Sequence, residues 1–118
     1  MRQRTLSLPV EQLAGTEEIA AIVEKIRREY HPEKIVLFGS YACGMPGKDS
    51  DVDLLIVKET KERPIDRRLA VARIISDSRR TIPVDAIVLT PNEIESRLGI
   101  GDQFIEEITR HGSVLYAA

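Results

Sequence analysis

Short apolar segments of strand length alternate with segments of helical periodicity along this chain. The strand-like segments span residues 34–38, 51–57 and 82–89. Between them, apolar residues recur at three- and four-residue steps, which places them on one face of a helix. In a chain of 118 residues, this alternation predicts a single α/β (α+β) domain in which helices cover a sheet. Residues 1–15 show no sustained period and are predicted to be a lead-in to a domain at 16–118.

Two helices are predicted in the first two thirds of the chain. The first spans residues 16–30, with Thr16 as its candidate N-cap, and ends before the His31–Pro32 pair because proline donates no amide hydrogen. The second begins at Pro64 and runs to about residue 78. Its expected buried face consists of apolar residues at helical spacing, namely Ile65, Leu69, Ala72, and Ile74 or Ile75.

Two more helices are predicted toward the C-terminus. Thr90, Pro91 and Glu93 combine an N-cap hydroxyl, a proline at the first helical position and an acid three residues after the cap, which is a capping box. Gly99 and Gly101 end this helix. The last helix is expected to be capped by Asp102, to turn Phe104, Ile105 and Ile108 inward, and to end at Gly112. A short apolar tail follows at residues 114–116.

Charge and cysteine content exclude several classes of function. Seventeen Lys and Arg against nineteen Asp and Glu give a net charge of -2, which argues against a nonspecific nucleic-acid binder held by phosphate charge. No apolar run approaches the roughly 20 residues of a membrane span, and no secretion signal is visible, so we expect a cytoplasmic protein. The single cysteine, Cys43, excludes an intramolecular disulfide and is expected to be a small packed residue.

The residues that carry chemical information lie at the end of the first strand and on the next two. Gly39 and Ser40 follow a buried strand, where backbone amides and a hydroxyl can face a phosphate. Asp51 and Asp53 are two residues apart and therefore project to one side of a strand. Asp85 adds a carboxylate inside a third apolar strand, where an unpaired charge is costly. Three such carboxylates suit magnesium, and two ions would serve nucleotidyl transfer.

Other interpretations of these residues are structural. Asp51 could cap a turn, Asp53 could face solvent on an edge strand, and Asp85 could pair with one of the chain's many arginines, two of which lie just upstream at 79 and 80. The basic residues around the second helix could receive an acidic partner or a phosphate tail, although a solvated helix face is favoured; they are Arg63, Arg67, Arg68, Arg73, Arg79 and Arg80. A short helix is expected to begin at Gly39 and Ser40, and Tyr41 could stack on a base or pack over that helix. His31 and His111 are read as helix-end residues and not as ligands.

The motif Leu37–Phe38–Gly39–Ser40, a ten-residue gap and Ser50–Asp51–Val52–Asp53–Leu54 resembles the signature of DNA polymerase beta-like nucleotidyltransferases, and in particular the minimal nucleotidyltransferase (MNT) group. The resemblance covers residues 19–116 and implies the nucleotidyltransferase fold, a small mixed sheet flanked by helices. It also implies ATP as substrate and two magnesium ions. The family's site residues map onto Gly39 and Ser40 for nucleotide phosphates, Asp51 and Asp53 for both metals and the nucleotide, and Asp85 for the catalytic metal.

One residue departs from the family pattern. Many members have an arginine where this chain has Cys43, which puts one phosphate or partner contact in question.

The acceptor of the nucleotide is expected to come from outside the domain, because 118 residues leave no room for a second one. Resemblance to stand-alone MNT proteins implies a toxin partner of the HEPN (higher eukaryotes and prokaryotes nucleotide-binding) type. This protein would then be the antitoxin, transferring AMP from ATP to a tyrosine of the toxin. Two alternatives remain at this stage: transfer to a small molecule such as an aminoglycoside, which would require an oligomer, and an antitoxin that acts by binding alone.

Overall fold

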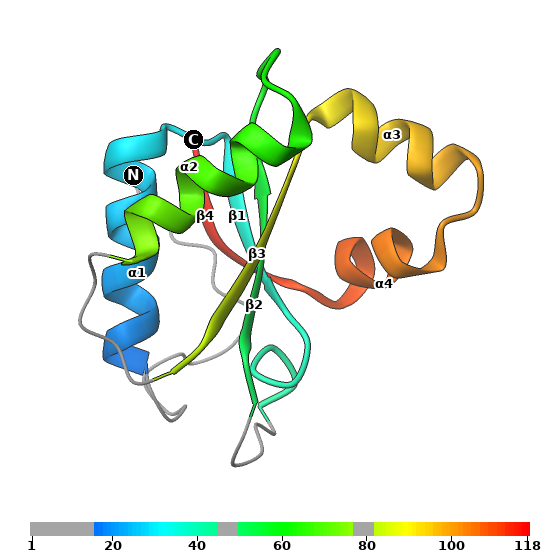
Figure 1. Ribbon diagram of the computed structural model, residues 1–118. Helices are drawn as coiled ribbons and strands as arrows, with labels where there is room; N and C mark the ends of the chain where they lie inside the picture. The colour runs from blue at the N-terminus through cyan, green and yellow to red at the C-terminus, as the bar shows by residue number, and fades with distance from the viewer. Residues whose placement is uncertain (1–15, 45–49, 77–81) are drawn as a thin grey trace.

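The protein folds around one mixed sheet of four strands (Figure 1). The computed structural model describes residues 16–44, 50–76 and 82–118. The elements in chain order are α1 (Thr16–Tyr30), β1 (Lys34–Phe38), β2 (Val52–Val57), α2 (Pro64–Ser76), β3 (Val84–Leu89), α3 (Pro91–Gly99), α4 (Gln103–His111) and β4 (Ser113–Ala117). The predicted lead-in at 1–15 and the arginines at 79 and 80 lie outside the described residues.

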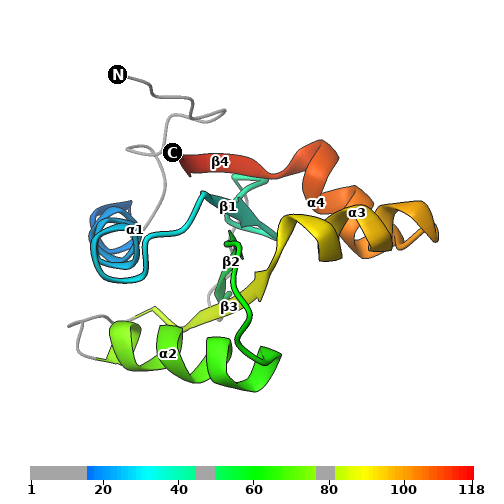
Figure 2. The ribbon, with the colours of Figure 1, turned by 90° about the horizontal axis from the view of Figure 1, so that it is seen from above.

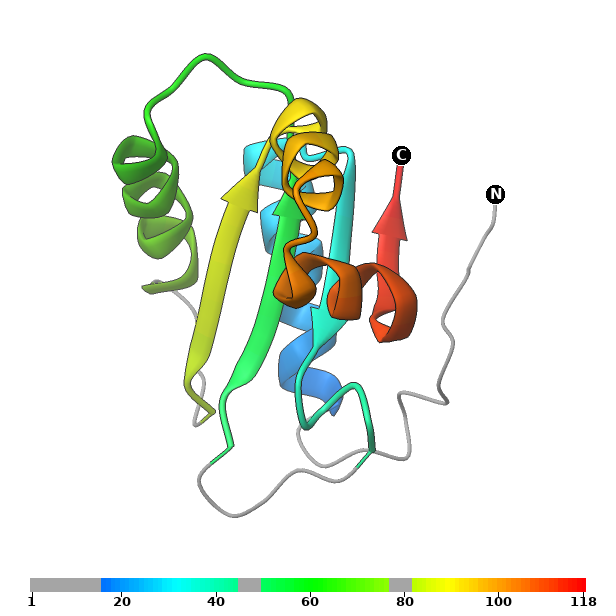
Figure 3. The same ribbon diagram turned by 90° about the vertical axis from the view of Figure 1, so that its right-hand side faces the viewer.

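The strand order is β3-β2-β1-β4, which Figure 3 shows with β3 and β4 at the two edges. β1 pairs antiparallel with both β2 and β4, whereas β2 and β3 run parallel. A parallel pair needs a crossover connection, and α2 provides it. The mixed sheet with flanking helices confirms the expected fold class.

Helices cover both faces of this sheet. Seen from above in Figure 2, α1 and α2 lie on one side and α3 and α4 on the other. One core joins α1 and α2 to inward residues of the central strands such as Leu37 and Leu54. The second core joins α4 to Val36 and Leu55, which point the opposite way. Burial on both faces explains why β1 and β2 are continuous apolar runs and not alternating ones.

The predicted element boundaries agree closely with the structure, with one instructive shift. The third strand begins at Val84 and not at residue 82. Pro83 precedes it and has no amide hydrogen, but its carbonyl accepts a hydrogen bond of 2.9 Å from the backbone N–H of Val52. This bond joins the starts of β2 and β3, so the residues that follow on each strand are aligned side by side.

The predicted buried face of the second helix is confirmed at Ile75 and wrong at the other three positions. Ile65 and Leu69 are 51% and 48% exposed, and Ala72 is exposed as well. Besides Ile75, the helix buries Arg67 and Val71. Two apolar stripes run along this helix, so periodicity alone does not select between them, and the packing of α2 against α1 and β3 selects the one that contains an arginine.

Arg67 is buried because it has several partners. Its guanidinium donates to Glu93 Oε1 at 2.7 Å and to the carbonyl of Glu62 at 2.9 Å. The same Glu93 oxygen accepts from the Thr90 backbone N–H at 2.9 Å, and Thr90 Oγ1 accepts from the Glu93 N–H, so the predicted capping box is confirmed. The expected solvated face of α2 therefore does not include Arg67. It is the residue that ties α2 to the start of α3.

The structure tests three further predictions about which side chains are buried. Ile105 and Ile108 are buried as expected, but Phe104 is 51% exposed. Cys43 is exposed and not packed. Tyr41 is 5% exposed and belongs to the core, which favours packing over base stacking for this ring.

No helix within the described parts of the chain has the length and apolar character of a membrane span.

Candidate active site

The corner after β1 brings backbone donors to one end of the sheet. Gly39 has a φ of +79°, which turns the chain sharply out of the strand. The carbonyl of Gly39 accepts hydrogen bonds from the N–H groups of Ala42 and Cys43 at 3.1 and 3.2 Å. Residues 40–44 form consecutive turns and not the short helix that was expected. The backbone amides of Ser40 and Tyr41, at the start of the turn, take no part in these two hydrogen bonds.

The sheet register places Asp53 at the centre of the site. Asp53 lies opposite Phe38 on the antiparallel β1 and beside Asp85 on the parallel β3. Asp53 and Leu55 are two residues apart, so Asp53 faces the same side as the core under α4. The three strands thus carry, in spatial order, the Gly39 corner, Asp53 and Asp85. Asp51 precedes β2 and is exposed.

Asp53 lies in an unfavourable electrostatic environment. Partial burial raises its pKa above the usual 3.8, and the negative charges of Asp85 and then Asp51 raise it further. The interpretations of Asp51 as a turn cap and of Asp53 as a solvent-facing residue do not account for this mutual repulsion. A bound cation would relieve it.

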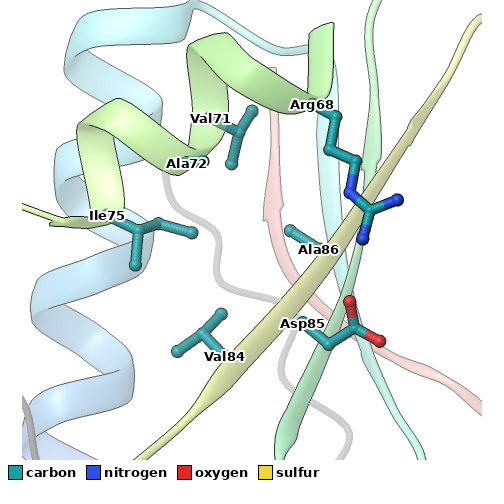
Figure 4. A pocket seen from close by; sticks show the side chains of 7 residues that line it. All are labelled: Arg68, Val71, Ala72, Ile75, Val84, Asp85 and Ala86. Carbon is teal, nitrogen blue, oxygen red and sulfur yellow. The ribbon is translucent and has the colours of Figure 1, made fainter. Parts of the chain in front are cut away.

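The carboxylates match a hard cation in type and position on the backbone, but their side chains do not form a closed ligand shell. Among residues 16–44, 50–76 and 82–118, no group of three or more His, Cys, Asp or Glu side chains is arranged to hold a metal ion. Asp85 is exposed, and its carboxylate points toward Arg68 of α2 in Figure 4. The backbones of Asp53 and Asp85 are neighbours in the sheet. To bring their carboxylate oxygens together, only the two short side chains need to rotate.

A pocket of about 360 Å³ opens between the Gly39 corner and α4. Asp53 and Cys43 line it on one side. Residues that sequence reasoning did not assign to the site line the other side, and they are Phe104, Glu107 and His111. Phe104 packs edge-on against Phe38, with ring centroids 5.6 Å apart. The helical spacing of Phe104, Glu107 and His111 is visible in the sequence. Only the packing of α4 over β1 shows that this side of the helix faces the pocket.

The family comparison agrees with this geometry. The model of the nucleotidyltransferase domain matches residues 19–115. The chain belongs to the nucleotidyltransferase domain family. The match includes Gly39, Ser40 and all three aspartates, and it confirms the resemblance drawn from the sequence.

Three solved structures are similar to this chain, and the first two of them show the same fold. A protein from Sulfolobus solfataricus described as a nucleotidyltransferase is 30% identical, with a TM-score of 0.54 over 68% of this chain and 70% of that one. The toxin-antitoxin pair MntA-HpeT includes a chain that is 18% identical, with a TM-score of 0.58 over 83% of this chain and 72% of that one. A minimal nucleotidyltransferase is 22% identical, with a TM-score of 0.48 over 90% and 95%. Comparison with curated protein sequences gives no match.

In this nucleotidyltransferase, we expect Gly39→Ala to damage the site more than its backbone cost alone would. A Cβ at Gly39 would collide with the Asp53 carboxylate, and the φ of +79° disfavours any L side chain. Gly101 is the matched control because it has the same φ of +79° but open space around a Cβ. Gly101→Ala should cost about 1–2 kcal/mol of unfolding free energy, and Gly39→Ala should cost more, as measured by denaturant unfolding.

The two alanine variants should also differ in nucleotide response. Magnesium with ATP should raise the melting temperature of Gly101→Ala but not that of Gly39→Ala, because only the latter displaces Asp53. Equal losses in both variants, in stability and in nucleotide response, would show that the close approach of Gly39 to Asp53 has no importance.

Proposed function

We propose that this nucleotidyltransferase is metal-dependent and transfers AMP from ATP to a hydroxyl group of a protein partner. The observation that carries the proposal is the parallel register of Asp53 with Asp85, next to a glycine corner that packs against the Asp53 carboxylate. A structural role for these acids would leave the repulsion around Asp53 unexplained. A role in catalysis accounts for it, because strained or repelling charges cluster where a cation or substrate binds.

The metal ligands in this proposal are the three aspartates. Asp51 and Asp53 would hold both magnesium ions, and Asp85 would complete the site of the catalytic ion. Carboxylate oxygens are the ligands that magnesium prefers when it also binds substrate phosphates. When bound, magnesium supplies charge neutralisation for the phosphates and for the reacting oxygens.

The chain's own groups would orient the substrates. The Ser40 hydroxyl and the first amides of the turn would bind phosphate oxygens, and the pocket under α4 would take the nucleoside. Asp85 lies on the far side of Asp53 from the corner and is exposed, so it would face the acceptor. The acceptor oxygen would form a bond to the α-phosphorus, the bond to pyrophosphate would break, and the hydroxyl proton would pass to the Asp85 carboxylate.

The proposed partner is a HEPN-type toxin, and this chain would be its antitoxin. One observation supports it: a chain of the same fold occurs in the MntA-HpeT toxin-antitoxin pair. A separate acceptor protein fits a domain whose third aspartate is open to solvent.

The test is to incubate the protein with ATP, magnesium and the product of the neighbouring gene, and then to weigh that product. We expect it to gain the mass of one or more AMP groups, and to gain nothing when chelator replaces magnesium. An unchanged mass would contradict the proposal. So would neutralisation of the toxin that survives Asp53→Asn, or efficient modification of an aminoglycoside without any protein partner.

A further inference from the structure

A second pocket lies on the opposite side of Asp85 from the nucleotide pocket. It has a volume of about 370 Å³ and lies between the beginning of α2, β3 and the α3–α4 region. Its lining includes two basic side chains, Arg68 and Arg97, together with Asp85 and Phe104. Phe104 also lines the first pocket, so the two pockets share one residue of their walls, and the aspartates that line them, Asp53 in the first and Asp85 in the second, are neighbours in the sheet.

Arg68 is available to a ligand in this pocket. Figure 4 shows its guanidinium reaching from α2 over β3 toward the Asp85 carboxylate. Within the described parts of the chain, Arg68 forms no hydrogen bond or ion pair, unlike the neighbouring Arg67 and Arg63. Arg97 has one partner, Asp102, at the long distance of 4.0 Å. Two guanidinium groups at one pocket favour a ligand that brings carboxylates or another anion.

The shape of the pocket favours an extended polypeptide. Its β3 residues run consecutively from Asp85 to Leu89, so the pocket follows the strand along its length. β3 is an edge strand that pairs only with β2 in the described sheet. The outer edge of such a strand can offer backbone N–H and C=O groups to an added chain, which is a common way to recognise a peptide. At the end of β3 the Val88 carbonyl already accepts from Arg67 at 3.4 Å, so the edge before Val88 is the part left for an added chain.

We infer that the pocket along β3 is the docking site for the acceptor, an extended acidic segment of a protein whose carboxylates bind Arg68 and Arg97. This inference rests on the proposed function and deepens it by naming the chemistry of the acceptor. Arg68 reaches toward Asp85, so a carboxylate of the acceptor bound to Arg68 would also lie near Asp85, with the guanidinium charge to offset the repulsion between the two acids. The hydroxyl of the same segment then lies at Asp85, next to the nucleotide.

Direct binding tests the inference separately from catalysis. The probes are fluorescein-labelled peptides with one tyrosine flanked by glutamates or by lysines, measured by fluorescence anisotropy with the full chain. We expect the glutamate peptide to bind and the lysine peptide not to bind. Arg68→Gln and Arg97→Gln should each weaken the glutamate peptide about tenfold, which corresponds to about 1.4 kcal/mol.

Arg73→Gln is the matched control, because Arg73 is exposed on the same helix and lines neither of these two pockets. It should leave peptide binding unchanged. Equal weakening by Arg73→Gln, equal binding of the two peptides, or displacement by free glutamate as effective as displacement by peptide would overturn the inference. If the peptide binds as expected but receives no AMP, the proposed function fails while the docking site stands.

Discussion

Asp53→Asn is expected to reduce nucleotidyl transfer by at least about 100-fold, since loss of even an outer-shell partner of a metal ligand costs about 10- to 100-fold. Asp53 has the central place, with the Gly39 corner on one side and Asp85 on the other. An amide keeps the shape of the side chain but removes the charge that would hold a cation. The measurement is the rate of AMP incorporation into the partner protein at saturating magnesium and ATP.

Asp66→Asn is the matched control for this variant. Asp66 lies on α2, pairs with the exposed Arg63, and lines neither of the two pockets at the active site. Its activity should equal that of the parent protein. Magnesium with ATP should raise the melting temperature of the parent and of Asp66→Asn, but much less that of Asp53→Asn. Equal shifts in all three proteins would contradict the role of Asp53 as a ligand.

The stability of Asp53→Asn relative to the parent protein is also expected to depend on pH. In chelator, the charge on Asp53 destabilises the fold, because its folded pKa is raised above the ordinary 3.8 by burial and by the neighbouring acids. At neutral pH, Asp53→Asn should therefore melt at the same or a higher temperature than the parent. As pH falls through the raised pKa toward 3.8, the parent takes up a proton and gains stability relative to the variant. Thermal melts of both proteins across this interval give the comparison.

Arg67→Met is expected to have the largest effect on stability. The Arg67 side chain is 6% exposed and Glu93 is 37% exposed, so the variant leaves one half-buried carboxylate without its cation. It also removes the Arg67 hydrogen bonds to the carbonyls of Glu62 and Val88. Breaking a fully buried pair costs about 3–5 kcal/mol, and the exposure of Glu93 lowers this to about 2–3 kcal/mol. We expect the melting temperature at pH 7 to fall by about 10 °C.

Arg63→Met is the control for loss of an arginine from the same helix. Arg63 pairs with Asp66, but its side chain is 77% exposed, so its loss should cost less than about 1 kcal/mol. Arg67 lowers the pKa of Glu93, so the stability from this pair is present above the ordinary pKa of a glutamate and is lost as pH falls through the lowered value. The difference between parent and Arg67→Met should shrink in acid. A constant difference would show that the packing of Arg67 matters and not its charge.

Local sequence signals predicted the elements and most of their ends. Thr90, Pro91 and Glu93 act within a few residues of each other, so the start of α3 depends on bonds that the sequence alone specifies. The same is true of Asp102, whose side chain caps α4 by accepting from two backbone N–H groups. The motif of Gly39, Ser40 and Asp53 also belongs to this class, but β2 begins at Val52, so strand alternation does not decide on which side the preceding Asp51 lies.

The tertiary structure decided which groups meet. The burial of Arg67 depends on Glu93, which is far away in sequence and comes within 2.7 Å only when α2 packs along β3, the strand that leads into α3. The place of Asp53 beside Asp85 depends on the parallel register of β2 and β3, and the pocket next to Asp53 depends on the packing of α4 over β1. Periodicity reports which residues share a face of one element. The face that is buried, and the residues that contact it, follow from the free energy of packing all the elements together.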